Sequence, residues 1–207
     1  MQKKISRATL ERLPQYYRVL KIFYDGGEEI ISSSKLAKTL KFTPEQIRKD
    51  FSDLGQFGIK GVGYNVAKIK RAVENTLGLQ YHWHLAIIGV GHLGTALANY
   101  KNFSLLGFQV CALFDVKEDL IGQKINDVKV YDFAKLDAVY RRKIIDIGVI
   151  TVPAVQAQNV ADNLISVGVK GIWNFAPIRL SVPPEISIVN EDLSLGLMNL
   201  SYHLSQT

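Results

Sequence analysis

The sequence is poor in cysteine and histidine, and it contains no long apolar run. Its single cysteine, Cys111, excludes an internal disulfide and a cysteine-based metal cluster. Cys111 lies in the apolar segment "FQVCALFDV", so we expect a buried and unreactive thiol. No stretch reaches the ~18 apolar residues of a membrane span, and the N-terminus has no apolar signal-peptide core. We therefore expect a cytosolic protein without a membrane segment, and we identify no metal site.

Positive charge is concentrated in the N-terminal part of the chain. Residues 1–80 contain 15 Lys and Arg residues against 8 Asp and Glu residues, whereas residues 81–207 contain 10 against 11. This asymmetry favours a polyanion such as nucleic acid as the partner of the N-terminal part; the alternative is a solvated basic face. The length of 207 residues and the hydrophobic content of 47% fit one large domain or two small ones with a buried core.

The first 57 residues predict three helices. In the first, Pro14 suits the first turn and Gly26-Gly27 ends the helix. Its inward positions, at helical spacing, are Leu13, Tyr16, Tyr17, Leu20 and Tyr24. A serine among residues 32–34 caps a short second helix that buries Leu36, Ala37 and Leu40.

The third helix begins with a capping box. Thr43 is the cap, Pro44 takes the first helical position, and Gln46 lies three residues after the cap. The buried stripe is Ile47, Phe51 and Leu54. Two short helices separated by a turn form a helix-turn-helix within residues 15–57, and the second helix would present Gln46, Arg48, Lys49 and Asp53 to DNA.

A glycine-rich segment, "GQFGIKGVGYN", follows this helix and predicts a small hairpin, or wing, over residues 58–64 with Lys60 near its tip. A fourth helix is capped by Asn65, ends at Gly78, buries Val66, Ile69, Val73 and Leu77, and exposes Lys68, Lys70 and Arg71. Residues 1–80 therefore predict a winged-helix DNA-binding domain; a helical oligomerisation domain is the alternative. The candidate DNA contacts are Gln46, Arg48, Lys49, Lys60, Gly61 and Tyr64.

The stretch "AIIGVGHLGTALAN" carries a Gly-x-Gly-x-x-Gly motif between an apolar strand and a helix. Gly89 suits the tight turn, Gly91 lets the backbone approach a pyrophosphate, and Gly94 lets helix and strand pack closely. A second strand ends at Asp115, 21 residues past Gly94, where a ribose-binding carboxylate belongs. Asp115 favours NAD(H), although Lys117 would suit a 2′-phosphate and NADP. The other candidate cofactor contacts here are His92, Leu93, Thr95, Ala96 and Val116.

Strands and helices continue to alternate after Asp115, so residues 81–190 predict a Rossmann-like, doubly wound parallel sheet and the whole chain belongs to the α/β class. The carboxyl ends of parallel strands form the ligand crevice. We therefore expect the segments "TVP" and "NFAP" to flank a nicotinamide, although ordinary loops are the alternative. Their residues are Thr151, Val152, Pro153, Asn174, Phe175, Ala176 and Pro177.

No residue of this crevice suits acid–base catalysis. None of the four histidines follows a later strand, and the crevice segments offer side chains that make poor proton donors. We therefore expect a nucleotide-binding regulator without catalytic residues. Residues 191–207 predict a terminal helix with Glu191 and Asp192 in its first turn, whose leucines cover either its own sheet or a second subunit; we expect a homodimer. The leucines of its apolar side are Leu193, Leu197, Leu200 and Leu204, and Leu195 and Met198 broaden that side.

The order of these motifs resembles the Rex redox-sensing transcriptional repressors, above all in "QIRKDFSDLGQFGIKGVGYNV" and "GIWNFAPIRLSVP". The resemblance implies a homodimer that binds palindromic operators, is released by NADH, binds NAD+ in competition, and exchanges its terminal helix between subunits. It also implies that Tyr100 signals the redox state near the nicotinamide, with Asp192 of the other subunit as its partner and Arg18 as the alternative partner of Asp192. Leu193 departs from the family, because some members carry an aromatic residue there.

Together with these motifs, the resemblance implies a redox-sensing repressor that responds to the NADH/NAD+ ratio. An apolar environment at Phe175 and Ala176 would disfavour the charged, oxidised ring because charge is costly to desolvate. The alternatives are a small NAD-dependent oxidoreductase with a helical dimerisation domain, and a nucleotide- or coenzyme-A-binding subunit.

Overall fold

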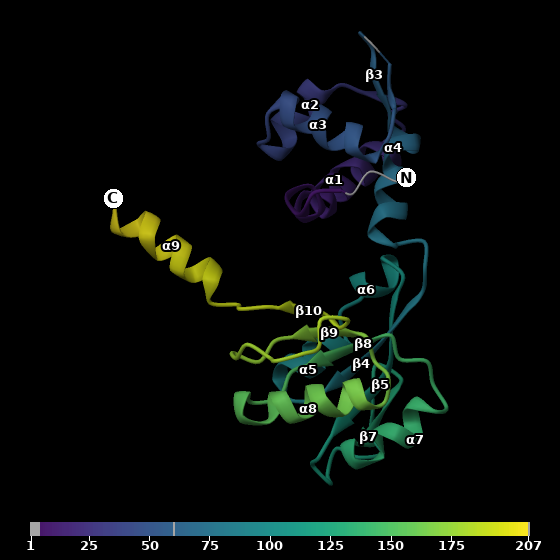
Figure 1. The fold of residues 1–207 in the computed structure, drawn as a ribbon, viewed down its shortest axis with the longest axis vertical. Coiled ribbons are helices and arrows are strands. Elements are labelled where there is room, and N and C mark those ends of the chain that lie inside the picture. The colour runs from purple at the N-terminus through teal and green to yellow at the C-terminus, as the bar shows by residue number, and fades with distance from the viewer. Residues whose placement is uncertain (1–4, 60, 207) are drawn as a thin grey trace. The chain divides into compact units, whose positions relative to one another are not determined.

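The computed structural model describes residues 5–59 and 61–206, and in it the chain forms two compact units that divide between Tyr81 and His82 (Figure 1). Lys60, the predicted tip of the wing, lies outside the described residues. Among the described residues, no helix combines the length and the apolar character that a membrane crossing needs.

The N-terminal unit is a winged helix. Its helices are α1 (Arg7–Asp25), α2 (Ser33–Leu40), α3 (Pro44–Leu54) and α4 (Val66–Leu77). Its strands β1 (Ile30–Ile31), β2 (Gly58–Ile59) and β3 (Gly63–Asn65) form an antiparallel sheet in the order β1-β3-β2. The predicted hairpin after α3 is therefore confirmed, and it gains β1 as a third strand.

Side-chain caps fix where these helices begin. Thr43 Oγ1 accepts a hydrogen bond from the backbone N–H of Gln46 at 3.2 Å, and Asn65 Oδ1 accepts one from Lys68 at 3.0 Å. Both caps were predicted, because capping depends on residues only three positions apart. The position of Pro14 was predicted wrongly. Ser6 caps α1, so Pro14 lies inside the helix rather than in its first turn.

The core of this unit includes apolar and aromatic side chains on the inner faces of α1 and α3. Leu13, Tyr16, Leu20, Ile47 and Phe51 are fully buried, as their helical spacing predicts. Tyr24, expected on the same stripe, is 50% exposed because it lies in the last turn of α1.

This core also contains a charged side chain, that of Asp50 on α3, and only 1% of this residue is exposed. Its carboxylate accepts hydrogen bonds from Arg12 Nε at 2.8 Å, Arg12 Nη2 at 2.7 Å, Tyr16 OH at 2.7 Å and Thr9 Oγ1 at 3.1 Å. These bonds join α3 to α1.

The second unit is built on a seven-stranded sheet in the order β10-β9-β8-β4-β5-β7-β6. All neighbouring strands are parallel except β6 and β7. The strands are β4 (Trp83–Ile88), β5 (Phe108–Asp115), β6 (Lys124–Ile125), β7 (Val128–Asp132), β8 (Ile147–Ile150), β9 (Gly171–Asn174) and β10 (Ser187–Asn190). The order is that of a Rossmann sheet with its switch point between β4 and β8. The predicted fold class is confirmed, although β6 and β10 were not predicted.

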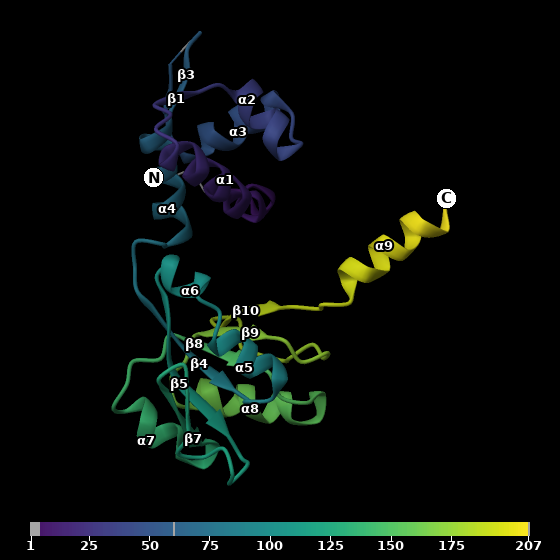
Figure 2. The same ribbon diagram turned by 180° about the vertical axis from the view of Figure 1, so that it is seen from behind.

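Helices pack on both faces of this sheet, as the two opposite views show (Figures 1 and 2). The helices of this unit are α5 (His92–Ala98), α6 (Asn102–Leu105), α7 (Leu136–Tyr140), α8 (Ala154–Ser166) and α9 (Leu195–Ser205); α9 buries none of its residues and does not pack on the sheet. Alternate residues of β4 enter different cores: Ala86 and Ile88 lie in the core of α7 and α8, whereas Leu85 and Ile87 lie in that of α5. This alternation buries the central strands on both sides.

The C-terminal helix begins later than predicted. Glu191 and Asp192 do not lie in its first turn, because α9 starts at Leu195. Glu191 instead continues the line of β10, and its N–H donates to the carbonyl of Asn174 at 2.8 Å. The Asp192 carboxylate accepts hydrogen bonds from the Ser194 N–H at 2.8 Å and from its hydroxyl at 2.5 Å. These bonds form a local turn that delays the helix.

Cys111 lies in β5 and is only half-buried, whereas its apolar segment predicts a buried thiol. Burial raises the pKa of its thiol, and the nearby ammonium of Lys143 lowers it by less. The pKa of Cys111 is therefore raised overall, so less of the nucleophilic thiolate forms and the thiol is unreactive.

Candidate functional site

A cavity of about 670 Å³ opens at the switch point of the parallel sheet. The glycine loop after β4, the end of β5, the segment after β8 and the first turns of α8 line it. A crevice is expected at this point, because connections at a switch point diverge to opposite faces of the sheet.

Each glycine of the loop meets a different steric demand. Gly89 has φ +95°, and a Cβ there would lie 2.9 Å from the carbonyl oxygen of Thr151. A Cβ on Gly94 would lie 2.0 Å from the carbonyl oxygen of Gly89, so only glycine lets α5 approach β4 this closely. A Cβ on Gly91 would meet nothing within 4 Å, so the loop is open on that side. The open side adjoins the start of α5, where the first backbone N–H groups have no partner within the helix.

Asp115 fixes the glycine loop through hydrogen bonds, and only 9% of this residue is exposed. One carboxylate oxygen accepts a 2.6 Å hydrogen bond from the Val90 N–H. The other accepts bonds from the N–H groups of Val116 at 2.8 Å and Lys117 at 3.0 Å. A carboxylate has about four acceptor sites, so capacity remains for a hydroxyl in the cavity. This second task, fixing the loop, was not predicted.

Thr151 closes the other side of the cavity. Its hydroxyl lies 2.7 Å from the carbonyl oxygen of Gly89 and 3.0 Å from that of Ile88, so the β8 segment is tied to the glycine loop.

The cavity contains some of the predicted contacts and not others. The predicted residues that line it are Gly89, Gly91, Asp115, Val116, Lys117, Thr151, Val152 and Pro153. Those that do not are His92, Leu93, Gly94, Thr95, Ala96, Asn174, Phe175, Ala176 and Pro177. Phe133, Gln156 and Asn159 also line it and were not predicted. The position of Gln156 and Asn159 on one face of α8, just after Pro153, was the available signal.

Asn174 shapes the segment after β9 instead of facing the cavity. It is fully buried, and its amide nitrogen donates to the carbonyl of Ile178 and to Asn190 Oδ1, both at 2.9 Å. Its amide oxygen accepts from the Ala176 N–H at 3.0 Å. Every polar atom of this side chain has a partner, which gives Asn174 a structural task.

Four aromatic rings run from the end of α5 to the same segment. The ring centroids of Tyr100 and Phe103 lie 4.9 Å apart, those of Phe103 and Trp173 5.8 Å, and those of Trp173 and Phe175 4.6 Å. Trp173 Nε1 also donates to the Glu191 carboxylate at 3.2 Å. Tyr100, which is 52% exposed, is thus linked through packed rings to the strand end that precedes Asp192.

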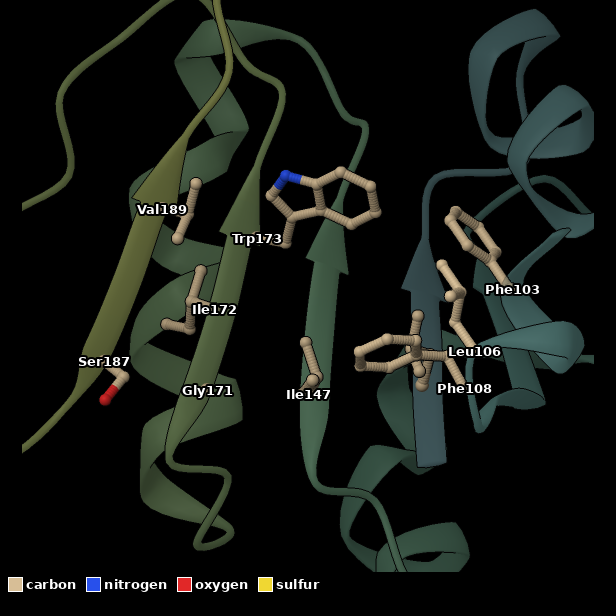
Figure 3. Close-up of a pocket in the computed structure, with 10 residues that line it drawn as sticks. Phe103, Leu106, Phe108, Ile147, Gly171, Ile172, Trp173, Ser187 and Val189 are labelled. Atoms are coloured by element: carbon tan, nitrogen blue, oxygen red, sulfur yellow. The ribbon is translucent and has the colours of Figure 1, made fainter. Parts of the chain in front are cut away.

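Trp173 and Phe103 also line an apolar groove of about 360 Å³ on the sheet (Figure 3). Figure 3 shows Ile147, Phe108 and Val189 beside them, on neighbouring strands of the same face. The terminal helix α9 offers a matching surface, because it contains no buried residue and its six large apolar side chains are 53–69% exposed.

The predicted DNA contacts of the N-terminal unit lie on α3 and in the hairpin after it. Lys49 and Arg48 are exposed on α3, and Arg48 contacts Glu45 at 2.5 Å and the Ser33 hydroxyl at 3.1 Å. Gln46 is half-buried. Tyr64 packs edge-on against Phe51 at 5.0 Å.

One cation expected on the outer face of α4 is not free. Lys70 is half-buried, pairs with Glu74 at 2.5 Å, and lies over the rings of Tyr17 and Tyr24. Lys68 and Arg71 of the same helix are exposed, as predicted.

Comparisons with known proteins agree with this architecture. Residues 80–178 match the family model described as "CoA binding domain", and residues 4–52 match the one described as "Putative DNA-binding protein N-terminus". The chain is 43% identical over 206 residues to the redox-sensing transcriptional repressor Rex of Clostridium botulinum (strain Hall), covering 100% of this chain and 98% of the relative. It is 44% identical over 207 residues to Rex of Clostridium novyi, covering 99% of each.

Solved structures agree as well. The crystal structure of RSP with NAD+ and operator DNA superimposes with a TM-score of 0.93 at 39% identity, covering 98% of this chain and 94% of that one. RSP, a Rex-family repressor, in complex with NADH gives a TM-score of 0.88 at 38% identity, covering 98% of this chain and 95% of that one.

A winged helix joined to a Rossmann-like domain is typical of DNA-binding transcriptional regulators whose second domain has a dinucleotide-binding fold. Within that class, the chain belongs to the Rex family of redox-sensing transcriptional repressors. Its relatives are named as repressors, which confirms the expectation of a regulator rather than an oxidoreductase.

Proposed function

We propose that this chain represses transcription by binding operator DNA as a homodimer, and that NADH in the crevice of the Rossmann-like unit releases it. The observation that carries the proposal is the presence, in one chain, of a capped α3 with exposed cations and a crevice closed by Asp115 and the glycine loop. RSP has been crystallised with operator DNA and NAD+ and separately with NADH, which supports operator DNA and both nicotinamide dinucleotides as ligands here. DNA and both nucleotides are found in the cytoplasm, where we expect the protein to act.

We assign DNA recognition to α3 and the wing. Lys49 and Arg48 contact phosphates or base edges in the major groove, and Gln46 is placed to read a base at the N-terminal end of α3. Gly61 has φ +76°, which favours glycine, and its Cβ position meets no other atom. The wing can therefore approach the DNA backbone closely at this residue. Lys60 adds a phosphate contact, and Tyr64 supports the wing by packing on α3.

We assign NADH to the crevice. The N-terminus of α5 and the open side of Gly91 accept the pyrophosphate, and Asp115 accepts a hydrogen bond from a ribose hydroxyl. The remaining contacts of our assignment are His92, Leu93, Gly94, Thr95 and Ala96 on the helix side, Val116 and Lys117 after β5, Thr151–Pro153 after β8 and Phe175–Pro177 after β9, the segment that Asn174 holds in place. The apolar side chains near Phe175 favour the neutral reduced ring over the charged oxidised ring.

We assign dimerisation to α9. An isolated helix of fewer than ~12–15 residues is marginal in water, and α9 spans the 11 residues Leu195–Ser205 without burying any of them. A second copy supplies both an apolar groove and an apolar helix, so exchange of α9 buries both surfaces. The groove lies beside Phe103 and Trp173.

We assign the switch to Tyr100, Asp192 and Arg18. Hydrogen bonds from Ser194 hold the pKa of the Asp192 carboxyl below its usual range, so it is charged at neutral pH. Arg18 is exposed on α1 of the DNA-binding unit, and Tyr100 begins the row of rings that ends at the segment after β9. NADH pairs Asp192 with Tyr100 of the partner subunit, whereas the DNA-bound form pairs it with Arg18.

Anisotropy of a fluorescent palindromic promoter fragment tests the proposal. We expect NADH to raise the Kd for DNA at least 100-fold and NAD+ to leave it nearly unchanged. A complete switch from 1:99 to 99:1 needs a differential affinity of about 10⁴ between the two states. Unchanged DNA affinity at saturating NADH would overturn the proposal. Asp115→Ala is the control, because it should bind DNA normally and require much more NADH for release.

A further inference from the structure

A second polar cavity lies toward the β7 side of the sheet, beside the crevice: its lining residue Asp132 is the strand partner of Asp115. It has a volume of about 610 Å³ and shares no lining residue with the crevice cavity. Three segments form it: the turn at Ile121–Gly122, the strand β7 next to the edge strand β6, and the region of α7 from Lys135 to Lys143. We call it the edge cavity.

The edge cavity is lined by four cations and one carboxylate. The cations are Lys129, Lys135, Arg142 and Lys143. The carboxylate, Asp132, accepts a 3.0 Å hydrogen bond from the Ala134 N–H at the start of a short 3₁₀ turn. Within residues 5–59 and 61–206, none of the four cations forms an ion pair with a carboxylate. By contrast Arg141, which does not line the cavity, pairs with Asp137 at 2.9 Å.

Backbone and ring contacts hold two of these cations in place. Lys143 is half-buried, and its ammonium donates to the carbonyl of Cys111 at 3.0 Å. The ammonium of Lys129 lies 5.5 Å from the centre of the Tyr131 ring, on the same face of β7. Each contact leaves donors of the ammonium free for a ligand, because a lysine carries three.

The strand pairing adds a further positive charge beside the cavity. Lys124 of β6 lies directly opposite Lys129 of β7 in the antiparallel register. Like charges in such a pair destabilise a sheet. Unpaired cations gathered around a cavity therefore cost stability, and a bound anion would remove that cost.

We propose that the edge cavity binds a small molecule carrying a chain of two or three phosphates, at a site separate from the dinucleotide crevice. Four positive charges against one carboxylate match the charge of such a chain. An arginine supplies a planar fork for phosphate oxygens and lysines supply point charges. The volume is close to that of the crevice, so a nucleoside polyphosphate fits.

Isothermal titration calorimetry of the full-length protein with inorganic triphosphate tests this proposal. The titration is run without NADH and again with saturating NADH, and we expect the same Kd in both. We expect Arg142→Ala and Lys135→Ala each to raise the Kd at least tenfold. Arg141→Ala is the matched control, because it removes the neighbouring, paired arginine, and we expect less than a twofold change.

Three results would overturn the proposal. Equal losses in Arg141→Ala and Arg142→Ala would indicate general attraction to a basic surface. Displacement of triphosphate by NADH would place it in the crevice. Loss of operator affinity in Arg142→Ala with unchanged triphosphate binding would make the patch a DNA contact. The titration without NADH does not depend on the proposed repressor function, so the two can fail separately.

Discussion

Replacing Asp50 by alanine should destabilise the N-terminal unit strongly. The substitution leaves the donors of Arg12, Tyr16 and Thr9 without their acceptor inside the unit. Breaking a buried ion pair by removing one partner costs roughly 3–5 kcal/mol. The side chain of Arg12 is 19% exposed and regains some water, so we expect a loss of about 3 kcal/mol, the lower end of that range.

Urea unfolding of the full chain measures this loss. Both tryptophans, Trp83 and Trp173, lie in the second unit, so their fluorescence follows that unit while far-UV circular dichroism follows both. With a slope of about 1.5 kcal/mol per molar urea, a loss of 3 kcal/mol lowers the midpoint of the N-terminal unit by about 2 M. The tryptophan transition should not move.

The matched control is Asp25→Ala in the same unit. Asp25 pairs with Lys21 at 2.8 Å, nearly the same distance as the pair of Asp50, but its side chain is 55% exposed. Exposed pairs contribute about 0–1 kcal/mol. A loss below about 1 kcal/mol for Asp50→Ala, equal to that of an exposed pair, would refute the argument that burial makes this cluster costly to break.

Four further predictions follow from the same structure. Burial raises the pKa of the Asp50 carboxyl, but the hydrogen bonds it accepts outweigh burial and lower it overall; its stabilising effect is therefore complete above the unfolded value of about 3.9 and is lost as the pH falls through the folded value. The difference in the free energy of unfolding between the wild type and Asp50→Asn should therefore become smaller below about pH 4 when it is measured by urea unfolding. A difference that does not change with pH would contradict this. Gly94→Ala should abolish NADH binding or folding, because its Cβ would meet the Gly89 carbonyl oxygen at 2.0 Å; a normal NADH titration would contradict the packing. Asp115→Ala should raise the Kd for NADH at least tenfold in a fluorescence titration and leave ligand-free DNA affinity unchanged, whereas loss of both would indicate misfolding. Leu200→Glu should shift the protein from dimer to monomer in analytical ultracentrifugation, and an intact dimer would exclude α9 from the interface.

Local signals explain what the sequence predicts well. Thr43 and Asn65 act on N–H groups three residues away, so their helices could be located from short segments. The glycine motif also combines neighbouring residues, and the structure places Gly89 and Gly91 at the crevice as expected.

Long-range contacts explain what the sequence leaves open. Asp50 is buried because its partners lie 34–41 residues away on α1, although its spacing of three from Ile47 already places it on the inner face. Asn174 is assigned to the crevice by its position after a strand, but it bonds to Asn190 on β10, a strand that the sequence pattern does not predict. Pro14 misleads because proline favours a first turn, whereas the cap at Ser6 starts α1 upstream and leaves Pro14 inside the helix.

In the proposed dimer, the uncovered helix α9 and the apolar groove are two separable halves of one interface. A chain that ends before Leu195 retains the groove and lacks the helix, whereas a chain with a bulky polar group at Val189 retains the helix and blocks the groove. Neither variant can pair with itself at either site, whereas a mixed pair forms one of the two contacts, with the helix of one chain in the groove of the other. Two defective alleles of this repressor should therefore complement each other partially in one cell, and either should interfere with a wild-type copy.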